Sequence, residues 1–347
     1  MSKVFDSAVD CKLLFNGPTQ TESSLILLRS KLSAIAQRRG MTDLKRENML
    51  LVASELVSNN VKHAGGRGMV QVWQQPGEVL DLLSLDYGPG IANLAKAEED
   101  GYSSASTLGK GLGAIRRLSD ESHIYTQSSV PGQMKKWSGT IILARFYLNE
   151  KCREIESGFK FGLFSRSLSD ERYNGDRIYL RQKGKMLRWL HLDGLGHGEE
   201  AQAATADLAR YLTEYDNPGA ILEMVDRQLA STRGAVAVTG EIDLLVSRMQ
   251  LLGVGDMHAH VYNQEQMQHL SFAPGILGRE HRKSALFQAE FDKKSVVVTA
   301  SDGIRRNWDM ANFAGLFNQH PQLIAYALGN IMGRISDDQS VCAANIG

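Results

Sequence analysis

Hydrophobic and polar positions in the first part of the chain follow helical and strand periods in turn. Apolar residues recur at helical spacing from Thr21 to Arg39 and again from Thr42 to Val61, which is typical of helices packed on one side. Thr42 is a suitable N-cap for the second helix, although no Glu or Gln follows it at the third position. Strands are expected over residues 12–15, 68–73, 79–85 and 140–146. The turn at Gln75-Pro76-Gly77 predicts that the two middle strands form an antiparallel pair.

The second half of the chain also mixes the two periods. Strands are expected over residues 177–180, 185–190, 236–238, 251–254, 258–263 and 294–299. Helices are expected over residues 199–214, 218–229 and 313–332. This pattern predicts the α/β (α+β) class, and a length of 347 residues favours two domains. The charged stretch after the strand at 140–146 is the expected linker, which gives domains at 1–147 and 159–347 joined by residues 148–158.

Composition excludes several classes of protein. Thirty-nine basic residues balance thirty-nine acidic ones, so neither a nucleic-acid partner nor a membrane partner is expected. No apolar run is long enough to span a bilayer, and the start lacks the apolar core of a signal peptide, so a cytoplasmic location is expected. Cys11, Cys152 and Cys342 are widely spaced and odd in number, which argues against a disulfide framework or a zinc site.

The helix predicted from Thr42 carries a polar stripe. Glu55, Asn59 and His63 repeat every four residues and therefore project from one face. Alone, such a stripe is most simply a solvated helix face. It is followed, however, by Asp86-Tyr87-Gly88-Pro89-Gly90 directly after a strand, and by Gly109-Lys110-Gly111-Leu112-Gly113 at the start of a helix.

These three motifs, in this order, resemble the boxes of the GHKL ATPase superfamily, and within it the anti-sigma-factor serine kinases. The resemblance implies a GHKL (Bergerat) α/β sandwich that binds ATP with Mg²⁺. It implies that Asn59 is a Mg²⁺ ligand, as an amide oxygen suits that ion. It also implies that Asp86 accepts a hydrogen bond from the adenine amino group.

The same resemblance assigns the remaining residues of the nucleotide site. Gly88 and Gly90 let the chain pass close to the base, and Gly109, Gly111 and Gly113 form a lid whose N–H groups face the phosphates. Thr140 adds a hydroxyl, and Glu55 is the general base. The sequence departs from many relatives at Asn60, where they have alanine.

Acidic residues in the second half point to a metal centre. Asp193 ends a strand within His191-Leu192-Asp193-Gly194, Asp302 follows another strand, and Asp176 and Asp337 lie in loops. Each of these positions alone is explained by an ordinary turn, because aspartate followed by glycine is common there. Together they favour a site for hard divalent cations, which bind several oxygen ligands.

These motifs resemble the SpoIIE-type branch of the metal-dependent PPM phosphatases, which implies an αββα sandwich. The resemblance implies that Asp176 and Asp193, with the Gly194 carbonyl, hold and bridge two metal ions, Mg²⁺ or Mn²⁺. Asp302 and Asp337 complete the ligand set, with Asp338 as a competitor for the role of Asp337. Two such ions lower the pKa of a shared water, which attacks phosphorus in line.

Two further residues, His197 and Arg233, each have two alternative roles. His197 either protonates the leaving oxygen or packs beside the metal loop. Arg233 either pairs with a substrate phosphate or forms a structural salt bridge.

The combined resemblance implies a cytoplasmic bacterial switch that dephosphorylates phosphoserine or phosphothreonine on a STAS-domain anti-anti-sigma protein. A sigma-factor regulator is a second expected partner, and the resemblance is compatible with a homodimer. One alternative makes the first domain a nucleotide-gated regulatory or partner-binding module without kinase activity. Another is a non-catalytic scaffold, which the set of four aspartates disfavours. A sensor histidine kinase is disfavoured because no phospho-acceptor helix or membrane segment precedes the first domain.

Overall fold

The computed structural model describes residues 2–21, 23–98, 111–129, 136–148, 158–263 and 266–347. The described residues form two compact units. The single-sheet unit contains those within 13–155 and 312–314. The sandwich unit contains those within 1–12, 156–311 and 315–347. Most of the predicted linker, residues 149–157, lies outside the described part of the chain.

The predicted start of the first domain differs from the structure. Residues up to Lys12 belong to the sandwich unit, because β1 (Ser2–Asp6) pairs antiparallel with β8 (Asp176–Lys183). The short helix α1 (Ser7–Asp10) follows β1, and Asp6 caps it by accepting a hydrogen bond from Ala8 N–H at 3.0 Å. The single-sheet unit is therefore inserted in the sequence between β1 and the rest of the sandwich unit.

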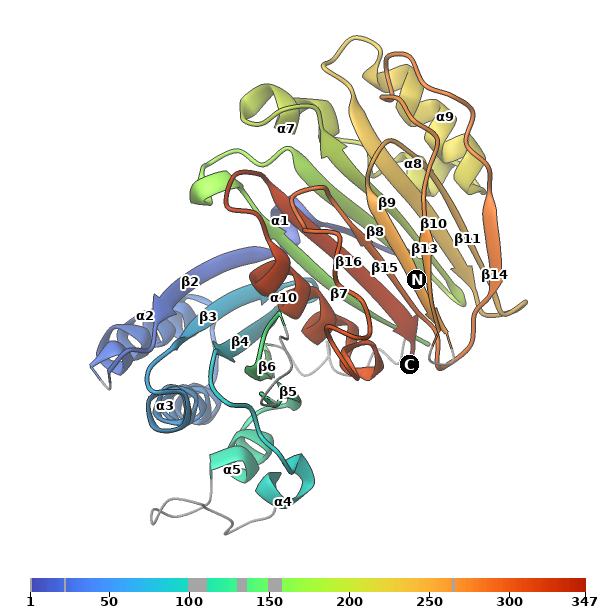
Figure 1. Cartoon of the computed structure of the whole chain (residues 1–347). Helices are drawn as coiled ribbons and strands as arrows, with labels where there is room; N and C mark the ends of the chain where they lie inside the picture. The colour runs from blue at the N-terminus through green and yellow to red at the C-terminus, as the bar shows by residue number, and fades with distance from the viewer. Residues whose placement is uncertain (1, 22, 99–110, 130–135, 149–157, 264–265) are drawn as a thin grey trace. The chain divides into compact units, whose positions relative to one another are not determined.

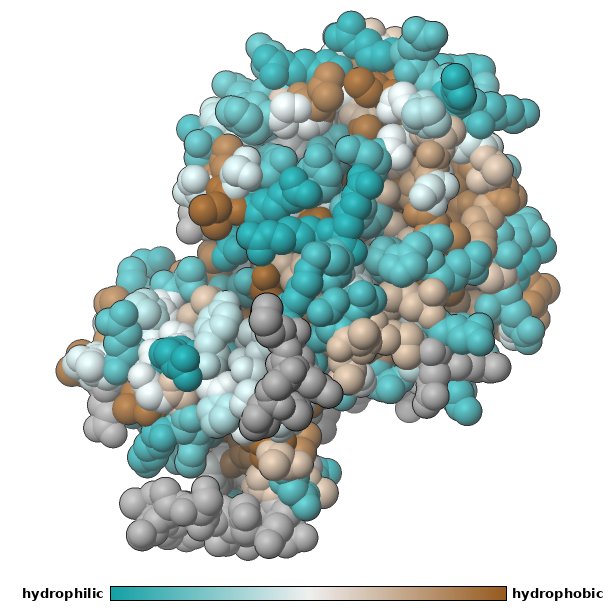
Figure 2. Space-filling model, viewed as in Figure 1, coloured by the Kyte–Doolittle hydropathy of each residue, from teal (hydrophilic) through white to brown (hydrophobic). Residues whose placement is uncertain are grey.

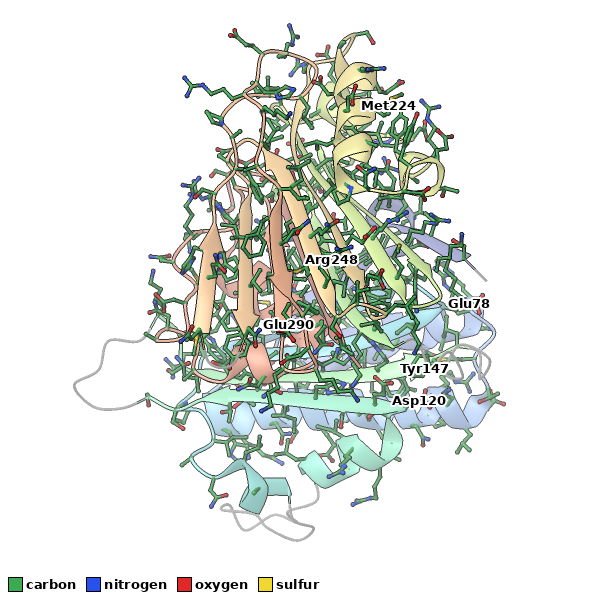
Figure 3. All side chains as sticks on the ribbon, turned by 90° about the vertical axis from the view of Figure 1, so that its right-hand side faces the viewer. Glu78, Asp120, Tyr147, Met224, Arg248 and Glu290 are labelled. Carbon is green, nitrogen blue, oxygen red and sulfur yellow. The ribbon has the colours of Figure 1, made fainter. Side chains whose placement is uncertain are left out.

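The single-sheet unit has one five-stranded sheet with the order β2-β3-β4-β6-β5 (Figure 1). Its elements are β2 (Lys12–Pro18), α2 (Ser24–Arg38), α3 (Asp43–Ala64), β3 (Gly68–Gln75), β4 (Val79–Asp86), α4 (Leu94–Glu98), α5 (Gly111–Leu118), β5 (Glu121–Gln127) and β6 (Gly139–Tyr147). The predicted antiparallel pair β3–β4 is confirmed. Figure 3 shows Glu78, Asp120 and Tyr147 at one end of this sheet, where Tyr147 N–H donates to Asp120 Oδ2 at 2.8 Å.

Helices α2 and α3 pack on one face of this sheet. Alternate strand residues share a face, so Val70 and Val72 of β3 meet Leu32 of α2 and Leu56 of α3 in one buried core. The predicted N-cap is confirmed, because Thr42 Oγ1 accepts a hydrogen bond from Lys45 N–H at 3.3 Å. This packing fixes α3, which carries the polar stripe, against the sheet.

The sandwich unit has two sheets, with the strand orders β1-β8-β9-β10-β11-β14 and β13-β12-β15-β16-β7. All neighbouring strands in both sheets are antiparallel. Its further elements are β7 (Phe159–Arg166), η1 (Leu168–Asp170), β9 (Met186–Gly194), α7 (Glu199–Thr205), α8 (Tyr211–Glu214), α9 (Pro218–Leu229), β10 (Ala235–Asp243), β11 (Arg248–Val254), β12 (His258–Asn263), β13 (Gln266–Leu270), β14 (Phe287–Glu290), β15 (Val296–Ala300), η2 (Leu316–Asn318), α10 (Pro321–Met332) and β16 (Gln339–Ile346).

Four layers make up this unit, as expected for an αββα sandwich (Figure 1). Leu212 of α8 and Val225 of α9 pack with Leu190 of β9 on the outer face of the six-stranded sheet. Helix α10 packs on β7 and β16 of the five-stranded sheet. Between the sheets, His191 of β9 is fully buried and its ring nitrogens bond Thr299 Oγ1 at 2.9 Å and Ser340 Oγ at 2.8 Å.

Two predicted helices are shorter than expected. The helix predicted over 199–214 is split into α7 and α8, because Asp207 adopts a left-handed φ of 58° between them. The helix predicted over 313–332 begins only at Pro321, since Gly315 has a φ of 76° and proline favours the first helical position.

Among the described residues, no helix combines the length and the apolar character needed to cross a membrane. Hydrophilic residues cover much of the visible surface around α7 and α9, at the top of the space-filling view (Figure 2).

Candidate nucleotide site and candidate metal centre

Helix α3 and the start of α5 bring the first group of predicted residues together. Glu55 and Asn59 lie one turn apart on α3 and are partly buried. Gly111, at the start of α5, is so close that a Cβ there would lie 3.2 Å from Glu55 Oε2 and 3.3 Å from Asn59 Oδ1. Gly113 lies in the same helix, whereas Gly109 lies outside the described residues. A backbone without a side chain thus faces the predicted base and the predicted magnesium ligand.

Asp86 ends β4 and is held by backbone donors. Its Oδ1 accepts hydrogen bonds from Gly88 N–H at 2.7 Å and Thr140 N–H at 3.2 Å. Burial raises the pKa of Asp86 above its ordinary value, although these bonds and His63 oppose the rise. A fixed carboxylate with a second oxygen is suited to accept a bond from an exocyclic amine.

The glycines of the second motif are required by close contacts. A Cβ on Gly88 would lie 2.9 Å from Asp86 Oδ1, and Gly90 has a φ of +75°. Thr140 is buried, and its hydroxyl lies 3.3 Å from Thr126 Oγ1. Thr140 contacts Asp86 through its backbone N–H, which donates to Asp86 Oδ1.

The contacts of Asn60 explain why this chain has asparagine at a position where many relatives have alanine. It is 2% exposed, donates to Thr19 Oγ1 at 3.0 Å and accepts from Ser84 Oγ at 3.1 Å. The side chain therefore joins α3 to β4 and to the end of β2, and it points away from the partly buried stripe of Glu55 and Asn59.

In the sandwich unit, Asp176 and Asp193 are direct cross-strand partners on β8 and β9. Asp176 is 3% exposed, and its Oδ2 accepts a hydrogen bond from Ser340 Oγ at 2.6 Å. Burial raises the pKa of Asp176 to about 8, although hydrogen bonds from Ser301 and Ser340 oppose the rise. Burial also raises the pKa of Asp193 well above its usual range, and repulsion from Asp176, Asp302 and Asp337 adds to the rise.

Asp302 and Asp337 reach the same place from two loops. Asp302 follows β15 and Asp337 follows α10. Burial raises the pKa of Asp302, and the next largest cause is repulsion from Asp337. The two loops are in tight contact, because a Cβ on Gly303 would lie 1.8 Å from the Asp338 carbonyl oxygen. The four predicted carboxylates thus interact with one another although they are distant in sequence.

Asp338 has a different role from Asp337. Its two carboxylate oxygens accept hydrogen bonds from the backbone N–H groups of Leu168 and Gly175, both at 2.7 Å. These bonds hold the loop that precedes Asp176, and Asp338 itself is 3% exposed. Asp337 accepts one backbone hydrogen bond, from Asp338 N–H to its Oδ1 at 2.9 Å, and also interacts with Asp302. Asp337 therefore stays the predicted metal ligand of the two, whereas both oxygens of Asp338 are taken by backbone donors.

The donor set fits divalent cations. Among the described residues, other carboxylates repel the negative charge of Asp193. Bound cations would neutralise these charges and remove the repulsion. In this part of the chain no three of these carboxylates place one oxygen each within 4.8 Å of one another. Ions held here would therefore complete their shells with water or backbone oxygen, as Mg²⁺ commonly does. Gly194 lies beside Gly175, whose carbonyl accepts the Gly194 N–H at 3.2 Å.

Other residues near this centre were only partly anticipated from the sequence. His191 bridges the two sheets and orients Ser340, a role that only the contacts between the sheets reveal. His197 is exposed and lowers the pKa of Asp338 slightly against the effect of burial. Arg233 forms an ion pair with Glu200, so the salt-bridge reading of Arg233 holds in this structure.

The fold and the two sites define the class of protein: a nucleotide-binding α/β domain joined in one chain to an αββα sandwich with a cluster of carboxylates. Residues 18–135 match the histidine kinase-like ATPase domain family. Serine/threonine-protein kinase RsbT of Bacillus subtilis (strain 168) is 32% identical over 115 residues, which are 33% of this chain and 84% of that protein. Through this segment the chain belongs to the histidine kinase-like ATPase domain family.

Solved structures add likenesses of fold. A chain from a structure of the bacterial stressosome is 23% identical with a TM-score of 0.50, and the match covers 54% of this chain and 99% of that one. The PP2C phosphatase domain of SpoIIE from Bacillus subtilis, with a fragment of its regulatory domain, is 13% identical with a TM-score of 0.45. That match covers 93% of this chain and 95% of the other. Two stacked antiparallel sheets with helices on both outer faces give the sandwich unit its αββα architecture.

Proposed function

We propose that the sandwich unit is a metal-dependent protein serine/threonine phosphatase that acts on a phosphorylated STAS-domain partner. The observation that carries this proposal is the placement of four carboxylates: Asp176 and Asp193 are cross-strand partners, and the loops of Asp302 and Asp337 touch where Gly303 meets the Asp338 carbonyl. Repulsion between these negative charges adds to the effect of burial in raising the pKa of Asp176, Asp193 and Asp302. Two divalent cations, Mg²⁺ or Mn²⁺, would neutralise these charges, lower the pKa of a water and bind phosphoryl oxygens.

The protein's own residues would prepare this site. Asp176 and Asp193 hold cations from neighbouring strands, and the Gly194 carbonyl is the expected backbone ligand. Ser340, itself bonded to His191, donates to Asp176 and fixes the direction of its carboxylate. Asp338 holds Gly175 N–H and so sets the position at which β8 begins. The substrate's phosphoester would then meet a site whose carboxylates do not need to reorganise.

We also propose that the single-sheet unit binds ATP with Mg²⁺ and is a serine/threonine kinase of the anti-sigma type. Asn59 would hold the cation, Asp86 the adenine amine, and Glu55 would accept the proton from an attacking hydroxyl. The place of Gly111 beside Glu55 and Asn59 supports this, because phosphates at the start of α5 would lie next to both residues. The rival function is a nucleotide-gated regulatory module.

The phosphatase proposal is tested with the whole chain, Mn²⁺ or Mg²⁺, and a serine-phosphorylated STAS-domain protein. Phosphate release should require the metal, stop with a chelator, and fall by at least about 100-fold in Asp193→Asn. The matched control is Asp216→Asn, because the Asp216 side chain is 97% exposed and lies on a different loop. Metal-independent release, or equal release by Asp193→Asn and the control, would refute the proposal.

The kinase proposal is tested by incubating the unphosphorylated STAS-domain protein with ATP and Mg²⁺. Glu55→Gln should bind ATP normally but transfer phosphate at least about 100 times more slowly. If the wild-type chain binds ATP and changes only the rate of dephosphorylation, without transferring phosphate, the regulatory module is the correct function.

A further inference from the structure

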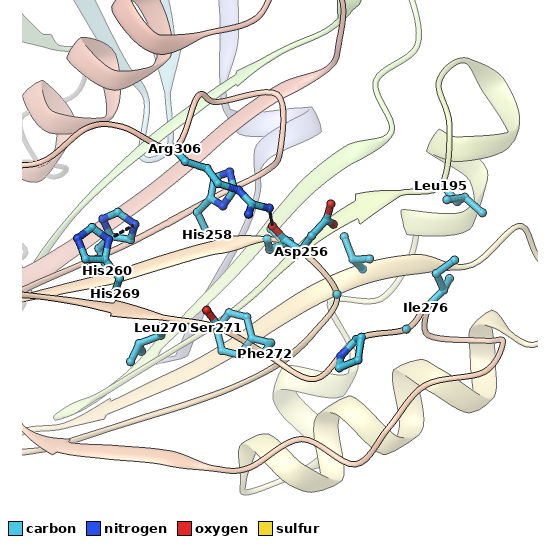
Figure 4. A pocket seen from close by; sticks show the side chains of 15 residues that line it. Leu195, Asp256, His258, His260, His269, Leu270, Ser271, Phe272, Ile276 and Arg306 are labelled. Carbon is cyan, nitrogen blue, oxygen red and sulfur yellow. Dashed lines mark hydrogen bonds between the residues drawn. The ribbon is translucent and has the colours of Figure 1, made fainter.

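A cleft of about 620 Å³ lies in the sandwich unit beside the carboxylate cluster, and no role has yet been assigned to it (Figure 4). Leu195, at one end of the cleft, directly follows Gly194 in the chain. Arg306, on another wall, stands on the loop that begins with Asp302. The Asp256 carboxylate, which also lines the cleft, raises the pKa of Asp302 by repulsion. The cleft therefore adjoins the place where phosphate would be released.

One part of the cleft wall is apolar. Leu270 at the end of β13 and Phe272, Pro274 and Ile276 in the segment that follows form this part, and Leu195 lies beyond them. Leu195 is 45% exposed, so its apolar surface is open to a ligand. Such a wall suits an apolar side chain of a bound polypeptide.

A second part of the wall is polar and suits a peptide group. His258 is 6% exposed, bonds the Ile304 backbone, and its Nε2 has no hydrogen-bond partner among the described residues. The Arg306 guanidinium lies beside this ring and donates to the Asp256 carbonyl at 3.3 Å (Figure 4). Because the His258 Nε2 is itself buried, the exposed Arg306 guanidinium is the group on this wall that can donate to a peptide carbonyl.

The back of the cleft is rigid. The His260 ring stacks on Trp308 with a centroid distance of 3.8 Å, and its Nε2 lies 3.1 Å from His269 Nδ1. Trp308 stands on the same loop as Arg306, so the loop that carries Asp302 is anchored against this stack. A ligand in the cleft would thus meet a preformed surface.

We infer that this cleft binds the polypeptide that flanks the phosphorylated residue, with an apolar side chain against Phe272 and Ile276 and a peptide carbonyl that accepts a hydrogen bond from Arg306. The inference rests on the proposed phosphatase function. It makes the enzyme selective for phosphoserine next to an apolar residue, whereas phosphoserine between glycines gains the backbone contact alone.

The test compares three probes with the whole chain and Mn²⁺: p-nitrophenyl phosphate, a phosphoserine heptapeptide flanked by leucines, and the same peptide flanked by glycines. The wild-type chain should prefer the leucine-flanked peptide by at least about tenfold in kcat/KM. Phe272→Ala and Ile276→Ala should each lower this ratio toward one. Leu245→Ala, at an apolar residue that is 80% exposed and outside the cleft, should keep it.

The outcomes separate the two proposals. Metal-dependent hydrolysis of p-nitrophenyl phosphate with no preference between the peptides would overturn the inference and leave the phosphatase function standing. A preference that Phe272→Ala and Ile276→Ala do not change would overturn it as well. If none of the three probes is hydrolysed, the phosphatase function itself fails, and the inference fails with it.

Discussion

Asn59 and Asn60 are neighbours on α3 with different surroundings, so their alanine variants should separate function from folding. Asn60 is 2% exposed and bonded to Thr19 and Ser84. Asn59 is partly buried and faces Gly111. We expect Asn60→Ala to destabilise the single-sheet unit while it keeps nucleotide binding. We expect Asn59→Ala to lose Mg²⁺-dependent ATP binding with little change in stability.

The size of the Asn60 effect follows from its two partners. Thr19 and Ser84 are both 1% exposed, so each hydroxyl loses a buried hydrogen bond in Asn60→Ala. A buried polar group left without a partner costs about 1–3 kcal/mol, and rotation of the hydroxyls toward other acceptors brings the sum to about 2–4 kcal/mol. For a unit of this size that corresponds to a decrease of about 6–16 °C in Tm.

Differential scanning calorimetry of the whole chain measures both effects. The transition of the single-sheet unit is the one that Mg²⁺ with ATP moves upward in the wild-type chain. Without nucleotide it should move down in Asn60→Ala and stay in place in Asn59→Ala. The nucleotide-induced rise should persist in the first variant and disappear in the second. The reasoning is refuted if Asn60→Ala unfolds like the wild type, or if Asn59→Ala retains the full rise.

Three further predictions concern the sandwich unit. Asp6→Ala removes two hydrogen bonds from the Arg177 guanidinium, at 2.9 and 2.6 Å. Calorimetry should show a decrease of about 4–12 °C in the Tm of this unit, and a phosphate assay should show slower phosphate release. Burial lowers the pKa of His260 to about 3, with further contributions from His269 and His258. As the pH falls below about 6.5, this histidine is protonated in the unfolded state before it is protonated in the folded state, so the free energy of unfolding decreases. Urea titrations should show a loss of unfolding free energy between about pH 7.5 and about pH 5 that is about 2 kcal/mol smaller in His260→Gln than in the wild type. Gly303→Ala should destabilise the unit and weaken Mn²⁺ binding measured by calorimetric titration, because its Cβ would overlap the Asp338 carbonyl.

Elements whose signals are local could be predicted from the sequence. Helix α3 has a long apolar period, a capping threonine at Thr42 and a left-handed glycine at Gly65, and all three act within a few residues. Strands β1, β7, β13, β14 and β16 of the sandwich unit were not predicted. Strand β16 consists largely of small residues, and it forms because β15 and β7 flank it on both sides. Such pairing is decided by residues far away in the sequence.

The site was predictable to the level of motifs and not to the level of contacts. Asp337 and Asp338 are adjacent and chemically identical, so no pattern distinguishes a predicted metal ligand from a carboxylate that holds a loop. The distinction depends on the N–H groups of Leu168 and Gly175, which reach Asp338 from another part of the chain. In the same way, His191 reads in sequence as a residue flanking a metal loop, whereas its contacts with Thr299 and Ser340 make it a bridge between the sheets.

The N-terminal segment shows why the domain boundary could not be read from the sequence. Residues 2–6 carry no strong period, and they form a strand because the edge of β8 offers unpaired backbone groups. The pairing is reinforced at the end nearest the candidate metal centre, where Arg177 binds Asp6 and Ile178 N–H donates to Ser7 Oγ at 2.9 Å. Arg177 directly follows Asp176, so β1 steadies the strand that presents this predicted metal ligand. A fragment of the sandwich unit cut at the predicted boundary would lack β1, and its predicted metal ligand Asp176 would lie on an unsupported edge strand.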